Sequence, residues 1–135
     1  MIKKQINWAK RHEYNVQTGL HPCVVVGMYD TKGKDTCSNP SKILLAPLGQ
    51  TDPLKISVVA REYCNDVPNE SLREDLDTIL EGRLEEHVDA DGAFDYRSVE
   101  GREVVAVVQC YQGKNHENPY SFVTDILPKD ALKAS

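Results

Sequence analysis

Most of the chain alternates short apolar runs with polar loops, a pattern typical of β-strands. The first run, 23–29, is rich in valine and is interrupted by Gly27, which suggests a bulge or a sharp bend. Four later runs also have the composition of strands: 42–48, 54–63, 102–111 and 120–127. The polar stretches 30–41 and 112–119 are rich in turn-forming residues, so we expect them to be loops.

One segment has the period of a helix instead. Four apolar residues recur at i, i+4, i+7 and i+8: Leu72, Leu76, Ile79 and Leu80. Ser71 and Glu74 fit a capping box at the start of this segment, and Gly82 fits its end. The pattern predicts a helix over 71–82 with one buried stripe.

The order of three strands, one helix and two strands is the element order of the OB-fold, a small and partly open barrel. The first strand of such a barrel bends sharply, and Gly27 stands where a bend is needed. We therefore expect an all-β protein with one helix, folded as a five-stranded OB-type barrel that the helix plugs. Another small α+β sheet with a helix on one face has the same element order and remains an alternative.

The length of 135 residues suits one hydrophobic core. The first residues mix the cations Lys3, Lys4, Lys10 and Arg11 with Trp8. We expect a basic and aromatic N-terminal arm over 1–19 and a single OB-like domain over 20–135.

The charge is unevenly distributed along the chain. The net charge of -5 excludes the wholly basic class of nucleic-acid binders. Residues 61–100 carry 13 acidic residues and four arginines, so the remainder of the chain is mildly basic. Either an acidic surface helix keeps the protein soluble, or the acidic segment leaves a basic face free on the other side.

The cysteines and the apolar runs suggest a compartment. No apolar run reaches the roughly 18 residues of a membrane span, and no signal-peptide core follows the first lysines. Four cysteines are too few for a disulfide scaffold, so we expect a cytoplasmic protein with reduced cysteines. Cys23 and Cys110 lie in apolar runs and should be buried as small hydrophobic residues.

Signatures of catalysis and of metal binding are missing from the sequence. Structural zinc sites take ligands in close pairs, and the nearest pair here is His21 with Cys23 on a predicted strand, so we expect no metal. Nucleophile-elbow, zinc-protease and phosphate-loop motifs are absent, and Gly33-Lys34 lacks the preceding glycines of a phosphate loop. We expect no enzyme, no cofactor and no small-molecule substrate.

Cations and aromatic residues gather where OB-folds hold single strands, on the second and third strands and in two loops. The cations are Lys32, Lys34, Lys42, Lys55, Arg61 and Lys114. The aromatic residues are Tyr29, Tyr63, Tyr111 and Tyr120, with Trp8 in the arm. Singly, loop lysines aid solubility and tyrosines at strand ends pack against the rim. Together these residues predict a surface that binds phosphates and stacks bases.

Four short segments carry a family resemblance: VVAREY at 58–63, SLREDL at 71–76, FDY at 94–96 and VEGR at 99–102. They resemble a pattern in small phage- and plasmid-borne proteins described as single-stranded DNA-binding or replication-associated, with an OB-like barrel. The likeness runs from about Gly19 to Pro128. The chain departs from common single-strand binders in lacking a Gly/Gln-rich linker and an acidic C-terminal tip.

The resemblance implies non-sequence-specific single-stranded DNA binding, as an accessory to replication or recombination. A homodimer is expected as well, because small barrels expose strand edges that a second copy can cover. One alternative is a protein–protein adaptor that works through the acidic helical face, 70–86. The other is a phage-type structural or inhibitory module.

Overall fold

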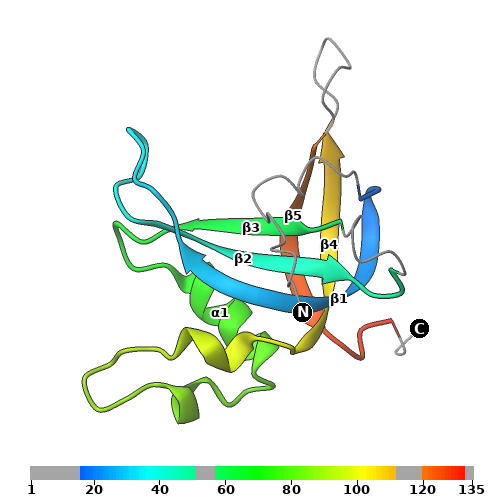
Figure 1. The fold of residues 1–135 in the computed structure, drawn as a ribbon. Helices are drawn as coiled ribbons and strands as arrows, with labels where there is room; N and C mark the ends of the chain where they lie inside the picture. The colour runs from blue at the N-terminus through cyan, green and yellow to red at the C-terminus, as the bar shows by residue number, and fades with distance from the viewer. Residues whose placement is uncertain (1–15, 51–56, 112–119, 133–135) are drawn as a thin grey trace, which may run out of the picture.

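The computed structural model describes residues 16–50, 57–111 and 120–132 (Figure 1). Its elements are β1 (Gly19–Asp30), β2 (Pro40–Pro47), β3 (Val59–Cys64), α1 (Glu70–Ile79), β4 (Glu103–Tyr111) and β5 (Tyr120–Pro128). Two short 3-10 helices, η2 (Leu84–His87) and η3 (Tyr96–Val99), lie between α1 and β4. The five expected strands and the single helix are confirmed, with ends shifted by a few residues.

The strands form one antiparallel sheet in the order β3-β2-β1-β4-β5. The long β1 pairs with β4 through its first half and with β2 through its second half, so it bends between two partners (Figure 1). The register against β2 shifts between Val25 and Gly27, which confirms the irregularity expected there. A Cβ atom on Gly27 would lie 2.6 Å from the Tyr29 hydroxyl, so glycine leaves room for the Tyr29 side chain to lie over the strand.

The sheet is not closed into a barrel, which limits the expectation of an OB-type barrel to its coarser features. In the part of the chain that the structure describes, β3 and β5 share no backbone pairing. Side chains bridge these two edge strands instead, because Nη1 of Arg61 lies 3.9 Å from Oδ1 of Asp125. The fold is therefore mostly β, a strongly curved five-stranded sheet with one helix.

The helix α1 covers one end of the curved sheet (Figure 1). Asn69 caps its start by accepting a hydrogen bond from the Leu72 amide at 3.1 Å. The expected capping box at Ser71 and Glu74 is therefore wrong, because the helix is capped two residues earlier than that box requires. The apolar stripe packs as expected: Leu76, Ile79 and Leu80 are buried in the main core, and Leu72 packs at its edge. No helix in the described ranges is long and apolar enough to cross a membrane.

The cysteines correct the expectation of a fully reduced chain. Cys37 and Cys64 form a disulfide, with Cα atoms 5.8 Å apart. The pairing of β2 with β3 sets Pro40 beside Cys64 and so brings together two residues that are 27 positions apart in the sequence. Cys23 is buried, as expected, whereas Cys110 is half-buried.

Part of the expected N-terminal arm lies outside the described residues, since the structure describes the chain only from Val16. Val16 is buried in the main core, and its backbone amide and carbonyl both hydrogen-bond the Ser121 hydroxyl, at 2.9 and 2.6 Å. Val16 is thus attached to β5, whereas Thr18 and Gly19 at the end of the expected arm contact β4.

Candidate nucleic-acid interface

A row of three polar side chains crosses the outer face of β1, β2 and β3. In the sheet register Tyr29 is paired with Lys42, and Lys42 with Glu62. Directly paired residues share a face of an antiparallel sheet, and successive residues alternate between faces. Since the neighbouring pair, Met28 and Ile43, is in the main core, the row faces away from the core.

Tyr29 is the aromatic residue of this row. Its side chain is 39% exposed, and its ring lies against Gly27, where a Cβ atom would meet it. A ring that lies against the strand at one end and is partly exposed offers a surface on which a base can stack. The expected stacking role of Tyr29 is therefore compatible with its position.

The loop between β1 and β2 returns towards this row. The Lys34 amide donates to the Cys37 carbonyl at 2.6 Å, and the Cys37 amide donates back at 3.1 Å. Nζ of Lys34 lies 3.9 Å from Oε2 of Glu62, which places this lysine at the β3 end of the row. Both side chains are largely exposed, so the ion pair is weak and Lys34 can turn to another anion. Lys32 is exposed in the same loop.

The base of this loop is fastened to the segment that follows β3. Carboxylate oxygens of Asp66 accept hydrogen bonds from the Ser38 amide at 2.9 Å, the Ser38 hydroxyl at 2.7 Å and the Asn39 amide at 2.9 Å. The Asn65 amide donates to the Asn39 carbonyl at 2.9 Å. These bonds, chiefly those from Ser38, hold the pKa of Asp66 below its ordinary value of 3.8.

This network predicts acid loosening of the loop. Because the pKa of Asp66 is lower in the folded protein, its stabilising effect is complete above about pH 3.8 and is lost as pH falls through the folded value. We expect the Ser38 and Asn39 amide resonances to titrate with a midpoint below 3.8. Two-dimensional NMR between pH 5 and pH 2 measures this, and Asp66→Asn should abolish the titration. A midpoint at or above the ordinary value would contradict the network.

Arg61 and Tyr63 occupy the opposite face, which corrects their expected role at the interface. Arg61 is paired with Ile43 in the register and therefore faces the core side, as does Tyr63 two residues on. Tyr63 is 5% exposed, and its hydroxyl donates to Asp75 at 2.6 Å. Nε of Arg61 lies 2.9 Å from the same carboxylate. Tyr63 has no open ring face for a base, and Arg61 is committed to an internal ion pair.

Burial dominates the titration of this internal cluster. It raises the pKa of Tyr63 strongly, and the hydrogen bond to Asp75 adds to that shift. It also raises the pKa of Asp75, although the Tyr63 hydroxyl and the Arg61 guanidinium oppose the shift. Sequence reasoning missed Asp75 as the partner of these residues. Its position in the sequence could have indicated burial, because residue 75 lies three after Leu72 and four before Ile79 and is therefore on the same helix face as the apolar stripe.

The second expected cluster lies at the other end of β1. Tyr111 is 49% exposed at the end of β4, and its cross-strand partner is Tyr120. Because Gly19 pairs with Val108, this end of β4 lies beyond the start of β1, whereas Tyr29 stands near its finish. Four expected groups lie outside the described residues: Trp8, Lys55, Lys114 and the side chain of Tyr120.

The outer face between these ends offers little open surface. Leu44, Ala46 and Val58 form a second, smaller cluster of buried residues there, with Val24, Val26 and Ala60 packed against it. Bases cannot stack on buried side chains, so the described interface is confined to the Tyr29 end. Its three lysines, Lys32, Lys34 and Lys42, are matched by Asp30, Asp35 and Glu62. Stacking therefore has to provide much of any affinity at this surface.

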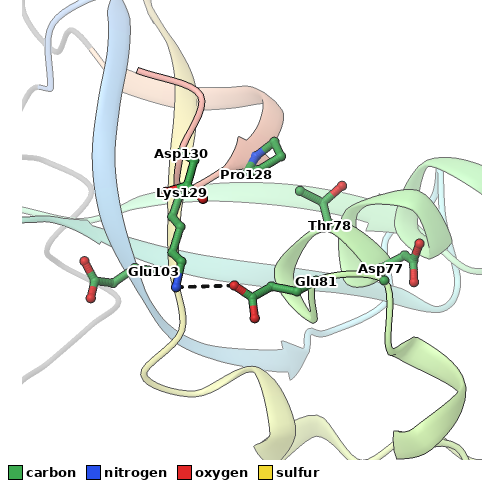
Figure 2. A pocket seen from close by; sticks show the side chains of 8 residues that line it. Asp77, Thr78, Glu81, Glu103, Pro128, Lys129 and Asp130 are labelled. Atoms are coloured by element: carbon green, nitrogen blue, oxygen red, sulfur yellow. Dashed lines mark ion pairs between the residues drawn. The ribbon is translucent and has the colours of Figure 1, made fainter. Parts of the chain in front are cut away.

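A pocket of about 360 Å³ lies elsewhere, between the end of α1 and the end of β5 (Figure 2). Four carboxylates line it, from Asp77, Glu81, Glu103 and Asp130. Among the described residues of its lining, Lys129 is the one cation, and it pairs with Glu81 at 3.3 Å. A pocket with this excess of negative charge repels phosphates, so it is a poor site for a nucleic acid.

The fold also assembles potential metal ligands that the sequence spacing had not suggested. One ligand atom each from Cys37, Cys64 and Asp66 lie within 4.8 Å of one another. The two sulfur atoms are bonded to each other, however, and the Asp66 carboxylate is occupied by the loop amides. In this state the group can offer a metal little beyond one carboxylate.

No protein-family model matches the chain, and no curated protein is significantly similar to it.

Proposed function

We propose that this protein binds single-stranded DNA without sequence preference, as an accessory to replication or recombination. The observation that carries the proposal is the outer-face row in which Tyr29 and Lys42 stand side by side, with Lys34 at its far end. A partly open ring next to cations is the combination that stacks a base while neutralising its phosphate. No reaction is part of the proposal.

The topology supports assigning the fold to the OB type. β1 is central and pairs with both β2 and β4, the helix falls between β3 and β4, and β3 approaches β5 through Arg61 and Asp125. The outer face of the second and third strands and the loop after the first strand are the surfaces with which OB-folds bind oligonucleotides. The outer-face row lies there. A homodimer that covers the exposed strand edges stays a prediction.

The proposal predicts separate effects for the ring and for the lysines. Tyr29→Ala should weaken binding of fluorescein-labelled oligo-dT by about 1–3 kcal/mol and leave the salt slope unchanged, because it removes a stacking surface and no charge. Three phosphate contacts at about -0.7 each give an expected slope near -2, and Lys34→Ala should reduce its magnitude by roughly 0.7. Fluorescence anisotropy at several salt concentrations measures both quantities.

Three further variants test whether the Tyr29 ring and the Lys34 charge act on DNA binding as proposed. Tyr29→Phe keeps the ring and should keep the affinity. Gly27→Ala keeps the tyrosine but places a methyl group where the end of its ring lies, so it should reduce affinity without unfolding the protein. Glu62→Gln removes the acid that competes for Lys34 and should strengthen binding. No binding of oligo-dT at low salt and micromolar protein would rule out the proposed function.

One observation favours the adaptor as the second candidate. A groove of about 540 Å³ runs beside the start of α1. Its apolar lining is Val67, Pro68, Leu72, Leu76, Leu84, Val88 and Phe94. Val67 is 68% exposed, and the charged residues Asp66, Glu70 and Arg73 also line the groove. Apolar and basic residues of a partner helix would suit such a groove. Glu70→Lys separates the two functions, because it reverses a charge in the groove and should disrupt an adaptor while leaving oligo-dT binding nearly unchanged.

A further inference from the structure

We propose that the Cys37–Cys64 disulfide is a redox switch for the loop 31–39, so that its reduction lowers the affinity of the protein for single-stranded DNA. The inference rests on the proposed function, because this loop carries Lys32 and Lys34. The bond joins the returning arm of the loop to the end of β3.

The disulfide and the hydrogen bonds hold different parts of the loop. The bonds from Asp66 and Asn65 fasten Ser38 and Asn39, at the base. The tip depends on the turn between Lys34 and Cys37, and Cys37 is the residue through which that turn is covalently fixed. Reduction therefore leaves the base attached and releases the tip, where the two lysines stand.

The packing of the tip makes it sensitive to this change. A Cβ atom on Gly33 would lie 2.7 Å from the Ser38 carbonyl oxygen, so the two arms of the loop are in close backbone contact. Lys34 reaches the outer-face row only while this turn is folded back over β3. A mobile tip has to lose conformational freedom when a phosphate binds, and that loss lowers affinity.

The chemistry balances with a dithiol as the reductant. Its thiolate attacks Sγ of Cys64, the more accessible of the two sulfur atoms, and Cys37 leaves as a thiolate. The second thiol of the reductant then resolves the mixed disulfide. Two protein thiols and one cyclic disulfide of the reductant result, with two electrons and two protons transferred to the protein.

The other cysteines do not interfere with this exchange. Cys23 is fully buried in the main core, and burial raises the pKa of its thiol to about 11, so it remains a protonated and unreactive thiol. Cys110 is half-buried on β4. The number of reactive thiols in the folded protein therefore reports the state of the Cys37–Cys64 pair.

The test compares the oxidised full-length chain with the same protein reduced by dithiothreitol. Three readouts are followed: native thiol titration, amide hydrogen exchange over residues 31–39, and anisotropy with labelled oligo-dT. We expect two additional reactive thiols, faster exchange at the loop tip, and affinity lower by about fivefold to tenfold. Cys37→Ser with Cys64→Ser should reproduce the reduced form, and Cys110→Ser should behave as the oxidised wild type.

The readouts separate failure of the switch from failure of the function. If dithiothreitol does not reduce the bond in the folded protein, or if verified reduction changes neither exchange nor affinity, the switch is wrong and the proposed function stands. If neither form binds oligo-dT at low salt, the proposed function fails and the inference fails with it. Should the double serine variant not fold, reduction of the wild type still decides the question.

Discussion

Replacing Asp75 with alanine is expected to lower the free energy of unfolding by about 3–5 kcal/mol, because it leaves a buried guanidinium without its charge partner. The Asp75 carboxylate lies 2.9 Å from Nε of Arg61 and accepts the Tyr63 hydroxyl at 2.6 Å. Nη1 of Arg61 is buried and already lacks a hydrogen-bond acceptor, so this side chain has no alternative to Asp75 of similar quality. Urea denaturation followed by circular dichroism measures the loss.

A compensating variant distinguishes the unpaired charge from simple loss of packing. Arg61→Met combined with Asp75→Leu and Tyr63→Phe removes both charges and the hydroxyl that donates to Asp75, so most of the lost stability should return. Glu74→Ala, at an exposed position of the same helix, should change stability by less than about 0.5 kcal/mol. A loss below about 1 kcal/mol for Asp75→Ala would mean that Arg61 finds solvent or Asp125, and that the cluster is not stabilising.

The cluster also links the inside of the sheet to its candidate interface. Arg61 joins β3 to α1 through Asp75 and to β5 through Asp125, while its chain neighbour Glu62 faces outwards in the row with Lys42. An Arg61 variant that weakened DNA binding would therefore do so by shifting β3. Measuring stability beside affinity separates this indirect effect from a lost phosphate contact.

The elements of this fold could be predicted from sequence because each depends on a local period. The valine-rich runs and the stripe of Leu72, Leu76 and Ile79 identify strands and helix without knowledge of their partners. Gly27 likewise signalled the irregularity in β1. Whether the sheet closes into a barrel could not be predicted in this way, because the approach of β3 to β5 depends on the curvature of the whole sheet.

The candidate site was only partly predictable because each side chain there depends on register. A shift of one residue in the pairing moves a strand side chain to the other face of the sheet. The register of β2 against β3 therefore determines that Lys42 lies on the outer face and Arg61 on the core face. The disulfide escaped prediction for a related reason. Its two cysteines become neighbours only through the pairing of β2 with β3, which no spacing in the sequence records.

Leu80→Ala should lower the free energy of unfolding by about 2–5 kcal/mol, because it removes a side chain from the junction between α1 and the main core. Leu80 is 1% exposed and belongs to the main core together with Leu76 and Ile79. Its amide donates to the Leu76 carbonyl at 3.0 Å, so the substitution leaves this helical bond in place and tests the side chain alone. Thermal unfolding and urea denaturation should agree on the loss.

Leu72→Ala is the matched control in the same helix, because it removes the same atoms from a position that only packs against the edge of the core. Because the truncation of Leu72 leaves no fully enclosed cavity, it should lower the free energy of unfolding by less, about 1 kcal/mol. Equal losses at the two positions would mean that α1 is not seated against the sheet as described. A smaller loss for Leu80→Ala than for Leu72→Ala would contradict the burial of Leu80 in the main core. It would mean that the Leu72 side of the helix, which borders the groove, is the buried side.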